Sequence, residues 1–435
     1  MTPALQDGKR VSYSERFLHF GNSRNAVPRG PMFSLNTLGH AIRSGHWPSL
    51  VGAWLHFEVS FMVWLLIGAL GVPIAEDFGL SPTQKGLLVA CPLLGGALLR
   101  VGVGLASDRL GAKRTGLYLL GGVTGAVLWG WLGATSYLQM LGVGLLMGFA
   151  GASFAVALPV ASRAYPPAHQ GLALGIAASA NSGTVLAMFF APRVSQLVGW
   201  HGVFGLMAIP LVITAILFWL FVQSDAGQPR TERHRLWWSD LAEMLHRPSA
   251  YWLCALYAVT FGGFVGLCSI LPIFLHDQYG LDVVEAGSVT ALCGLLGSLI
   301  RPLGGFVADR LGGIVVLGPV FVAIAGLLAG LGQLPPIAWA LSILIGAITV
   351  MGFGNGVVFQ VVSERFPKRI GIASGVIGAA GGFGGFLLPL WLGALKDLSG
   401  TFQPGLWLFA ALSLAAATSV ALVLRRTGDG GDPYS

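Results

Sequence analysis

Long apolar runs recur along this chain from residue 50 to residue 424, each about the length that a helix needs to cross a bilayer. The chain has 435 residues, of which 54% are hydrophobic and only 10% are charged. Soluble domains carry about 25% charged residues, so most of this surface is not built to face water. The runs are continuously apolar rather than alternating, which argues against a membrane barrel. We therefore predict an all-α membrane protein that crosses the bilayer many times.

The apolar runs divide into twelve predicted spans. Their approximate limits are 53–75, 84–106, 115–134, 138–161, 170–191, 203–223, 250–275, 286–307, 313–333, 337–362, 370–394 and 404–425. The longest polar connection separates six spans from six. The predicted organisation is an N-terminal arm (1–50), a six-helix half (51–223), a linker (224–249), a second six-helix half (250–426) and a tail (427–435).

The Lys and Arg residues are distributed unevenly between the two sides of the predicted membrane. With a cytoplasmic N-terminus, twenty of the 25 would lie in cytoplasmic segments, and only Lys85, Arg193 and Lys396 would lie outside. Arg100 and Arg301 fall within spans. Because cytoplasmic loops are enriched in Lys and Arg, we expect the arm, the linker, the tail and both termini in the cytoplasm. This bias also accounts for the net charge of +7 without a nucleic-acid partner.

The two halves share sequence. Residues 96–111 (GALLRVGVGLASDRLG) match residues 297–312 (GSLIRPLGGFVADRLG), and residues 171–183 resemble residues 371–385. The members of each pair cross the membrane in the same direction, so these are parallel repeats of six spans. Repeats of this kind place a substrate site near the middle of the membrane, between the halves.

A G-x-x-x-D-R-x-G motif follows the second and the eighth span, with Asp108 and Arg109 in one copy and Asp309 and Arg310 in the other. Two six-span halves with this motif resemble the major facilitator superfamily. The resemblance implies that superfamily's fold, with twelve transmembrane helices in two pseudo-symmetric six-helix halves. It also implies alternating access, with Asp108, Arg109, Asp309 and Arg310 as gating residues.

Arg100 and Arg301 occupy the same depth in the two halves, each eight residues before the aspartate of its motif. An arginine near the bilayer centre costs at least roughly 2.5 kcal/mol, so it needs a functional partner or a buried acid. Glu58 is the only acid within the predicted spans and cannot neutralise both. Two cations facing one cavity repel unless an anion lies between them, and a planar guanidinium suits a planar oxyanion. We therefore predict an anion site between the halves.

Several segments resemble the nitrate/nitrite porter family of the major facilitator superfamily, across essentially the whole chain from about residue 50. GALLR and SLIRP match its paired arginines, GIAASANSGT and GVIGAAGGFGG its glycine-rich signatures, and LYAVTFGGFVG and GASFAVALP its aromatic-bearing helices. The substrate-binding residues that the resemblance implies are Arg100, Arg301, Tyr257, Asn181, Phe154, Phe261, Gly183, Gly381 and Gly382. The second signature lacks an asparagine, so only backbone contacts are expected there, with Gly384 and Gly385 as further candidates. Asn355, the other intramembrane asparagine, is expected to tie helices together.

The resemblance implies a secondary transporter of nitrate, and of nitrite, rather than an enzyme. It further implies a bacterial inner-membrane protein of nitrate assimilation, monomeric and without a metal or cofactor. Only the lipid bilayer, the anions and protons are expected as partners.

Glu58 is the candidate for proton coupling, because a lone intramembrane acid needs a function or a partner. An acid in the first span resembles the symporter branch of the family, so we expect nitrate/proton symport in which Glu58 titrates. Three alternatives stay open. Glu58 could be a static carboxylate that balances one arginine, the protein could exchange nitrate for nitrite, and the site could serve a carrier or channel for another small monovalent anion.

Overall fold

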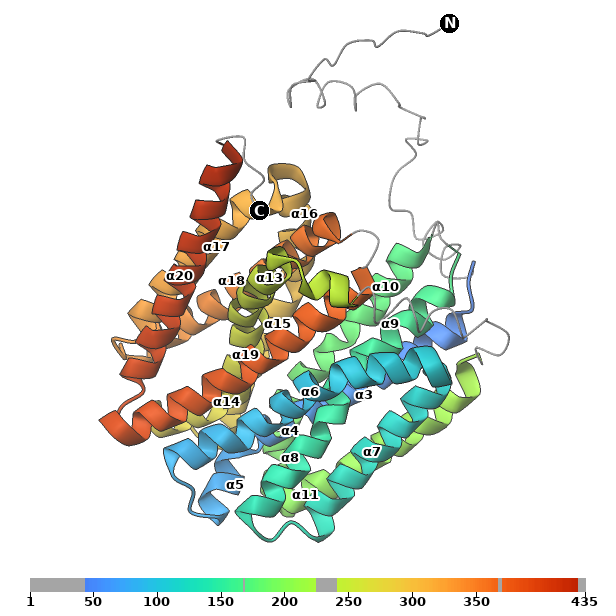
Figure 1. Cartoon of the computed structure of the whole chain (residues 1–435). Helices are drawn as coiled ribbons and strands as arrows, with labels where there is room; N and C mark the ends of the chain where they lie inside the picture. Colours follow the sequence, from blue (N-terminus) through green and yellow to red (C-terminus); the bar gives the residue numbers. More distant parts are fainter. Residues whose placement is uncertain (1–43, 167–168, 224–240, 367–369, 429–435) are drawn as a thin grey trace, which may run out of the picture. The chain divides into compact units, whose positions relative to one another are not determined.

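The first six predicted spans form one group of helices, and the last six form a second group beside it (Figure 1). This computed structural model describes residues 44–166, 169–223, 241–366 and 370–428, and all regular elements in those ranges are helices. Most of the predicted arm, linker and tail lie outside the described residues. From His46 onward both groups belong to one compact unit.

The first half follows the predicted spans but breaks them in several places. Its elements are α3 (Trp47–Trp64), α4 (Leu66–Ala69), α5 (Gly71–Asp77), α6 (Pro82–Leu110), α7 (Ala112–Leu132), α8 (Tyr137–Gly151), α9 (Phe154–Arg163), α10 (Gln170–Ser179), the 3₁₀ turn η2 (Ala180–Ser182) and α11 (Gly183–Phe221). The first span is α3 to α5, interrupted at Leu65 and Leu70. The sixth span begins inside α11, which bends at Gly199, where φ is 71°.

The second half repeats this plan. Its elements are α13 (Pro248–Tyr257), the π-helical turn η3 (Ala258–Gly262), α14 (Gly263–Tyr279), α15 (Val283–Leu299), α16 (Arg301–Leu311), α17 (Gly313–Leu331), α18 (Ile337–Arg365), α19 (Ile370–Ser399) and α20 (Gln403–Gly428). Ten helices among the described residues are long and apolar enough to cross a membrane. The broken first span and the bend in α11 account for the other two of the predicted twelve.

The repeated sequence produces repeated local structure at both ends of the second span of each half. α6 begins with a capping box between Ser81 and Gln84, and α15 begins with one between Asp282 and Glu285. After the D-R motifs, Gly111 and Gly312 adopt φ values of 91° and 87°, which favour glycine and end α6 and α16. We call the end of the molecule that carries these two turns the motif end.

The outer faces of the helices are apolar, as a bilayer requires. On the second leg of α11, large side chains such as Ile209, Ile216 and Trp219 are more than half exposed. Buried residues such as Phe204 and Phe218 occupy the inner side of the same leg. Contiguous exposed apolar surface of this kind is costly in water but favourable against lipid.

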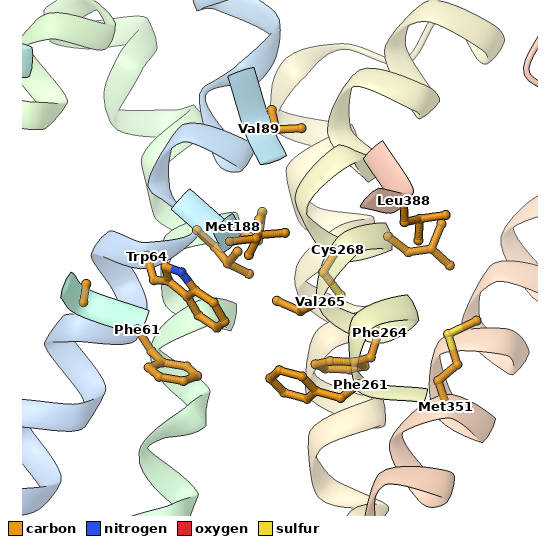
Figure 2. Close-up of a cluster of buried hydrophobic side chains, with 14 of the residues drawn as sticks. Phe61, Trp64, Val89, Met188, Phe261, Phe264, Val265, Cys268, Met351 and Leu388 are labelled. Atoms are coloured by element: carbon orange, nitrogen blue, oxygen red, sulfur yellow. The ribbon is translucent and has the colours of Figure 1, made fainter. Parts of the chain in front are cut away.

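The halves pack tightly at the end opposite the motif end, which we call the lysine end. There α6 and α19 approach so closely that a Cβ added at Gly86 would overlap the Pro389 carbonyl, and one at Gly393 would overlap the Pro82 carbonyl. Figure 2 shows the apolar side chains between the halves, with Phe61 and Trp64 facing the helices that carry Phe261, Val265 and Cys268. This packed layer lies between the lysine end and the middle of the molecule.

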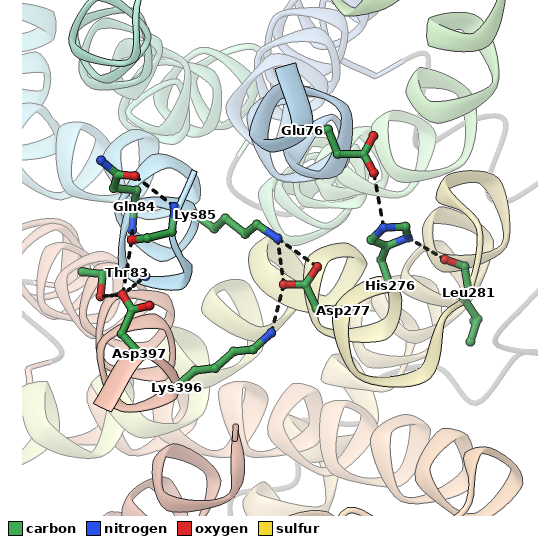
Figure 3. Close-up of polar contacts among 10 residues, drawn as sticks. Glu76, Thr83, Gln84, Lys85, His276, Asp277, Leu281, Lys396 and Asp397 are labelled. Carbon is green, nitrogen blue, oxygen red and sulfur yellow. Dashed lines mark hydrogen bonds and ion pairs between the residues drawn. The ribbon is translucent and has the colours of Figure 1, made fainter. Parts of the chain in front are cut away.

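Polar contacts close the lysine end beyond the apolar layer (Figure 3). Asp277 of α14 accepts from Lys85 of α6 at 2.9 Å and from Lys396 of α19 at 3.0 Å. Asp397 accepts hydrogen bonds from Thr83 of the first half, and Glu76 lies 3.4 Å from the His276 ring. Lys85–Asp277, Thr83–Asp397 and Glu76–His276 each join one half to the other.

Candidate functional site

A cavity of about 280 Å³ lies between the two halves near the middle of the helices. Its walls carry both intramembrane arginines, both intramembrane asparagines and six aromatic rings. The lining residues are Phe57, Phe61, Arg100, Phe154, Ala178, Asn181, Tyr257, Phe261, Arg301, Pro302, Asn355, Gly356, Phe359, Ser374 and Gly378. Among the described residues, no group of three or more His, Cys, Asp or Glu side chains could hold a metal ion. The cavity therefore offers positive charge, amides and ring faces, with no acid among the described residues of its wall.

Arg100 reaches from α6 to backbone carbonyls of both halves. Its Nη1 donates to the Gly378 carbonyl of α19 at 2.7 Å, and its Nη2 donates to the Gly151 carbonyl of α8 at 3.0 Å. Its Nε is buried and has no partner in the described part of the chain. Neutral carbonyls satisfy the guanidinium geometry but leave its positive charge unbalanced.

Arg301 begins α16 and presents more unengaged donors than Arg100. Its Nε and Nη2 are both buried and have no hydrogen-bond partner among the described residues. Neither arginine forms an ion pair with a carboxylate of the described chain. The two positive charges of the cavity are thus available to an anion.

Each arginine lies against an aromatic ring of its own half, in matching geometry. The Arg100 guanidinium carbon is 5.7 Å from the centre of the Phe154 ring, and that of Arg301 is 5.6 Å from Phe261. Phe264 adds a second ring 4.7 Å from Arg301. Contacts within about 6 Å are attractive because the ring face is negative. The rings therefore stabilise the positions of the two guanidinium groups without neutralising their charge.

Tyr257 of the second half lines the same cavity as the two arginines. Its ring stacks on Phe261 with centroids 5.0 Å apart and planes 2° from parallel, and meets Phe359 edge-on at 5.0 Å. It is close enough to Arg100 and to Arg301 to interact electrostatically with both. The π-helical turn η3 places Tyr257 and Phe261 together, and such turns often occur at functional sites.

The predicted glycines support the site from behind and are not on the cavity wall. A Cβ at Gly381 would lie 2.6 Å from the Tyr257 ring, and one at Gly382 would lie 3.1 Å from Ala97. Gly384 and Gly385 pack against η3 and α14, and a Cβ at Gly183 would overlap the Glu58 carbonyl. Two other glycines, Gly356 and Gly378, line the cavity, and Gly378 accepts a hydrogen bond from Arg100 through its carbonyl.

The two asparagines line the same cavity in different environments. Asn181 of η2 donates through Nδ2 to the Ser298 hydroxyl of α15 at 3.0 Å, so this amide joins the halves. Both polar atoms of the Asn355 amide are buried and have no partner among the residues described. The expectation that Asn355 ties helices together finds no hydrogen bond to support it, and a contact of that kind belongs to Asn181.

Glu58 of α3 is buried at the break between α10 and α11. It is 5% exposed, and its Oε2 lies 2.8 Å from the Ser182 hydroxyl, with the Gly183 backbone also close. The hydrogen-bond partner of Glu58 is a serine. The structure therefore gives no support to the alternative in which Glu58 balances the charge of one arginine. Glu58 is also absent from the residues that line the cavity.

The four predicted gating residues lie at the motif end. Arg109, Asp309 and Arg310 are exposed, and the Arg310 guanidinium lies 4.1 Å from the centre of the Phe306 ring. The side chain of Asp108 lies outside what the structure describes. A second cavity, of about 460 Å³, extends from Arg100 toward this end, past Gly104 and Ser107. The central cavity therefore continues toward the motif end, whereas packed and paired side chains close the lysine end.

Three aromatic residues on the cavity wall were not predicted from the sequence. Phe57 and Phe61 flank Glu58 at helical spacing, and Phe359 lies one turn after Asn355. The i, i+4 spacing of Phe359 from Asn355 is a signal that could have found Phe359, since it places both residues on one helix face. Phe57 and Phe61 are four residues apart and share a face in the same way, but neither is four residues from Glu58.

Two six-helix halves around a charged cavity, open toward one end and closed at the other, define a membrane transporter rather than an enzyme. The family model described as Major Facilitator Superfamily matches residues 53–389. The chain therefore belongs to the Major Facilitator Superfamily, and the resemblance to its nitrate/nitrite porter family is confirmed by named relatives.

Two curated relatives and one solved structure illustrate the similarity. The chain is 35% identical to the Probable nitrate/nitrite transporter NarK2 of Mycobacterium tuberculosis, over 84% of this chain and 94% of that protein. It is 32% identical to the Nitrite extrusion protein of Bacillus subtilis, over 85% and 92%. The crystal structure of a D-xylose-proton symporter superposes with a TM-score of 0.66 at 18% identity, over 86% of this chain and 97% of that one. The last match concerns the fold alone.

Proposed function

We propose that this protein is a secondary active transporter of nitrate and nitrite that works by alternating access. The observation that carries the proposal is the pair Arg100 and Arg301, which line one cavity with buried N–H groups and no acid between them. An anion of charge −1 would relieve the repulsion between two desolvated cations. The names of the relatives, nitrate/nitrite transporter and nitrite extrusion protein, agree with this substrate class.

The shape of the cavity favours a flat anion. Phe154 and Phe261 are set beside the two guanidinium groups, and Tyr257 lines the same cavity. A planar oxyanion can accept parallel N–H donors from a guanidinium in its own plane while its faces rest on aromatic rings. A tetrahedral phosphate or sulfate has no flat face and carries more charge to desolvate. Selection of nitrate and nitrite over such ions follows from these contacts.

The distribution of Lys and Arg supports a cytoplasmic motif end in a bacterial inner membrane, with both termini on that side. In that orientation the conformation described is closed toward the outside, with its cavity continuing toward the cytoplasm. The protein works as a monomer, because the cavity is complete within one chain.

Counterflow in proteoliposomes tests this proposal. Unlabelled nitrate inside should accelerate the uptake of labelled nitrate, a result that a carrier gives and a channel does not. Arg100→Lys and Arg301→Lys should each lower the uptake at least about tenfold, because lysine keeps the charge but loses the planar fork of donors. Arg426→Lys, at the exposed end of α20, is the control. Uptake without counterflow, or unchanged uptake by both cavity variants, would contradict the proposal.

For the driving force we favour nitrate/proton symport through Glu58. The Ser182 hydroxyl lies within hydrogen-bond distance of both Glu58 Oε2, at 2.8 Å, and the Ser179 carbonyl, at 2.9 Å. A hydroxyl donates one proton, so it cannot serve two acceptors at once. If Glu58 carries a proton, it donates to Ser182, and Ser182 donates to Ser179. A protonated carboxyl gives each of these two contacts its own proton, whereas an ionised one shares the Ser182 proton with the Ser179 carbonyl.

The protonation state of Glu58 would also affect a hydrogen bond that joins the two halves. Ser182 is the neighbour of Asn181, whose amide bonds to Ser298 of the second half. Loss of the proton would rearrange the Ser182 contact next to this link. Nitrate/nitrite exchange is the alternative, and the position of Glu58 away from the cavity wall favours it, because an exchanger needs no titrating group.

A further inference from the structure

Asn355 of α18 is a buried amide whose two polar atoms lack hydrogen-bond partners in the described chain. The residue is 2% exposed, and Nδ2 and Oδ1 are both buried without a hydrogen-bond partner among the described residues. Most buried amides are paired, because an unpaired polar group keeps the full cost of losing its water. The side chain lies on the wall of the central cavity. Asn355 therefore borders the space that a ligand in the cavity would occupy.

The backbone fixes Asn355 close to Arg301. A Cβ added at Gly356 would overlap the Arg301 carbonyl, and one added at Gly304 would overlap the Phe353 carbonyl. The backbones of α18 and α16 thus touch on both sides of this level, as small residues allow in membranes. The amide and the guanidinium consequently enter one cavity from adjacent points of two helices in contact. On Arg301, Nε and Nη2 are likewise buried and have no hydrogen-bond partner in the described part of the chain.

The second amide of the cavity serves as the comparison. Asn181 already uses Nδ2 in its hydrogen bond to Ser298 across the two halves. Asn355 presents an unengaged NH₂ group, and it does so beside the arginine with the larger number of unengaged donors. The two asparagines are therefore suited to different tasks, one to joining the halves and the other to contacting a ligand.

We propose that Asn355 is an anion-binding residue, with Nδ2 donating to an oxygen of the planar oxyanion held by Arg301. This role rests on the proposed transport of such an anion. A charged donor and a neutral donor can share one small oxyanion, because each oxygen accepts more than one hydrogen bond. The amide oxygen cannot accept from a deprotonated anion, so it accepts from the Arg301 guanidinium or from a water bound with the anion. The two guanidinium charges attract any small anion, whereas the directional hydrogen bond from the amide orients the bound oxyanion.

Asn355→Leu in the full-length protein tests this role, since leucine has a similar size and no polar atoms. Nitrate binding measured by calorimetry should weaken about tenfold. The melting temperature without anion should stay the same or rise, because two unpaired polar atoms leave the interior. The matched variant Asn181→Leu should instead lower the melting temperature, because it leaves the Ser298 hydroxyl unpaired. Asn355→Asp, nearly unchanged in shape, should abolish binding at neutral pH by placing a negative charge beside Arg301.

The outcomes separate this role from the transport proposal. If the unaltered protein binds neither nitrate nor nitrite, the proposed function fails and this role fails with it. If the unaltered protein binds nitrate and Asn355→Leu binds it equally well, the role of Asn355 is wrong and the transport proposal stands. A marked loss of stability in Asn355→Leu without anion would show a structural amide and would also overturn the role.

Discussion

The protonation state of Glu58 determines how one hydroxyl group near the cavity is hydrogen-bonded. Glu58 shares one serine hydroxyl with a backbone carbonyl, so its protonation decides which contact the hydroxyl makes. A glutamine at this position copies the protonated carboxyl, because its NH₂ group donates to Ser182. The two forms of Glu58 can therefore be separated by one substitution.

Glu58→Gln should abolish nitrate accumulation driven by a pH gradient and preserve nitrate counterflow. The reason is that glutamine copies the protonated form of Glu58 but cannot release or bind a proton. The variant can therefore exchange nitrate for nitrate but cannot couple nitrate uptake to a pH gradient. Uptake in proteoliposomes with and without a pH gradient measures this. Glu243→Gln, which neutralises an exposed carboxylate paired with Arg247, is the control. Gradient-driven accumulation that persists in Glu58→Gln would exclude the proton role and favour nitrate/nitrite exchange.

For single residues, the sequence predicts which charged side chains lie in the cavity better than it predicts which side chains form hydrogen bonds with one another. The equal spacing of Arg100 and Arg301 from their motifs was enough to place both on one cavity. The partners of Asn181 and Asn355 could not be foreseen, because a hydrogen bond depends on which neighbouring helix faces each amide. One alternative paired Glu58 with an arginine, but the hydrogen-bond partner of Glu58 is Ser182, which lies where α10 breaks from α11.

Among the elements, α19 shows how a glycine-rich helix supports a site through close backbone packing. The π-helical turn η3 packs closely against the glycines of α19, and this packing fixes the positions of Tyr257 and Phe261. Helix limits near those observed were predictable from the apolar runs, since hydrophobic length is set by the bilayer. The breaks at η2 and η3 were not, because they result from contacts with helices distant in sequence.

Gly381→Ala should lower both the melting temperature and the affinity for nitrate. The added Cβ would lie 2.6 Å from the Tyr257 ring and 2.9 Å from Phe261, so both rings must shift. Overpacking of this kind costs about 1–3 kcal/mol. Gly326→Ala in α17 meets no atom within 4 Å and should be neutral or slightly stabilising. Thermal melting with and without nitrate compares the two, and equal behaviour would show that α19 tolerates the side chain.

The whole molecule combines a closed lysine end with a cavity that continues toward the motif end. The closed end is held by glycine-mediated helix contacts, an apolar layer and the carboxylate of Asp277 between two lysines (Figures 2 and 3). Alternating access requires these contacts to separate in another conformation. Separation would leave Lys85 on one half and Lys396 on the other, so both cations would then flank the mouth on that side and attract anions.

Asp277→Asn should make the lysine end open more often. The substitution leaves two lysines, with side chains 20% and 16% exposed, without their shared carboxylate. The cost lies between those of exposed and fully buried pairs, roughly 1–3 kcal/mol, and would favour opening by about tenfold or more. Cys268, which is 3% exposed within the apolar layer, reports opening through its rate of alkylation, followed by peptide mass spectrometry. Asp282→Asn removes a charge at the same end but keeps the helix cap, because asparagine caps as well as aspartate. If Cys268 reacts at the same rate in both variants, Asp277 does not hold this end closed.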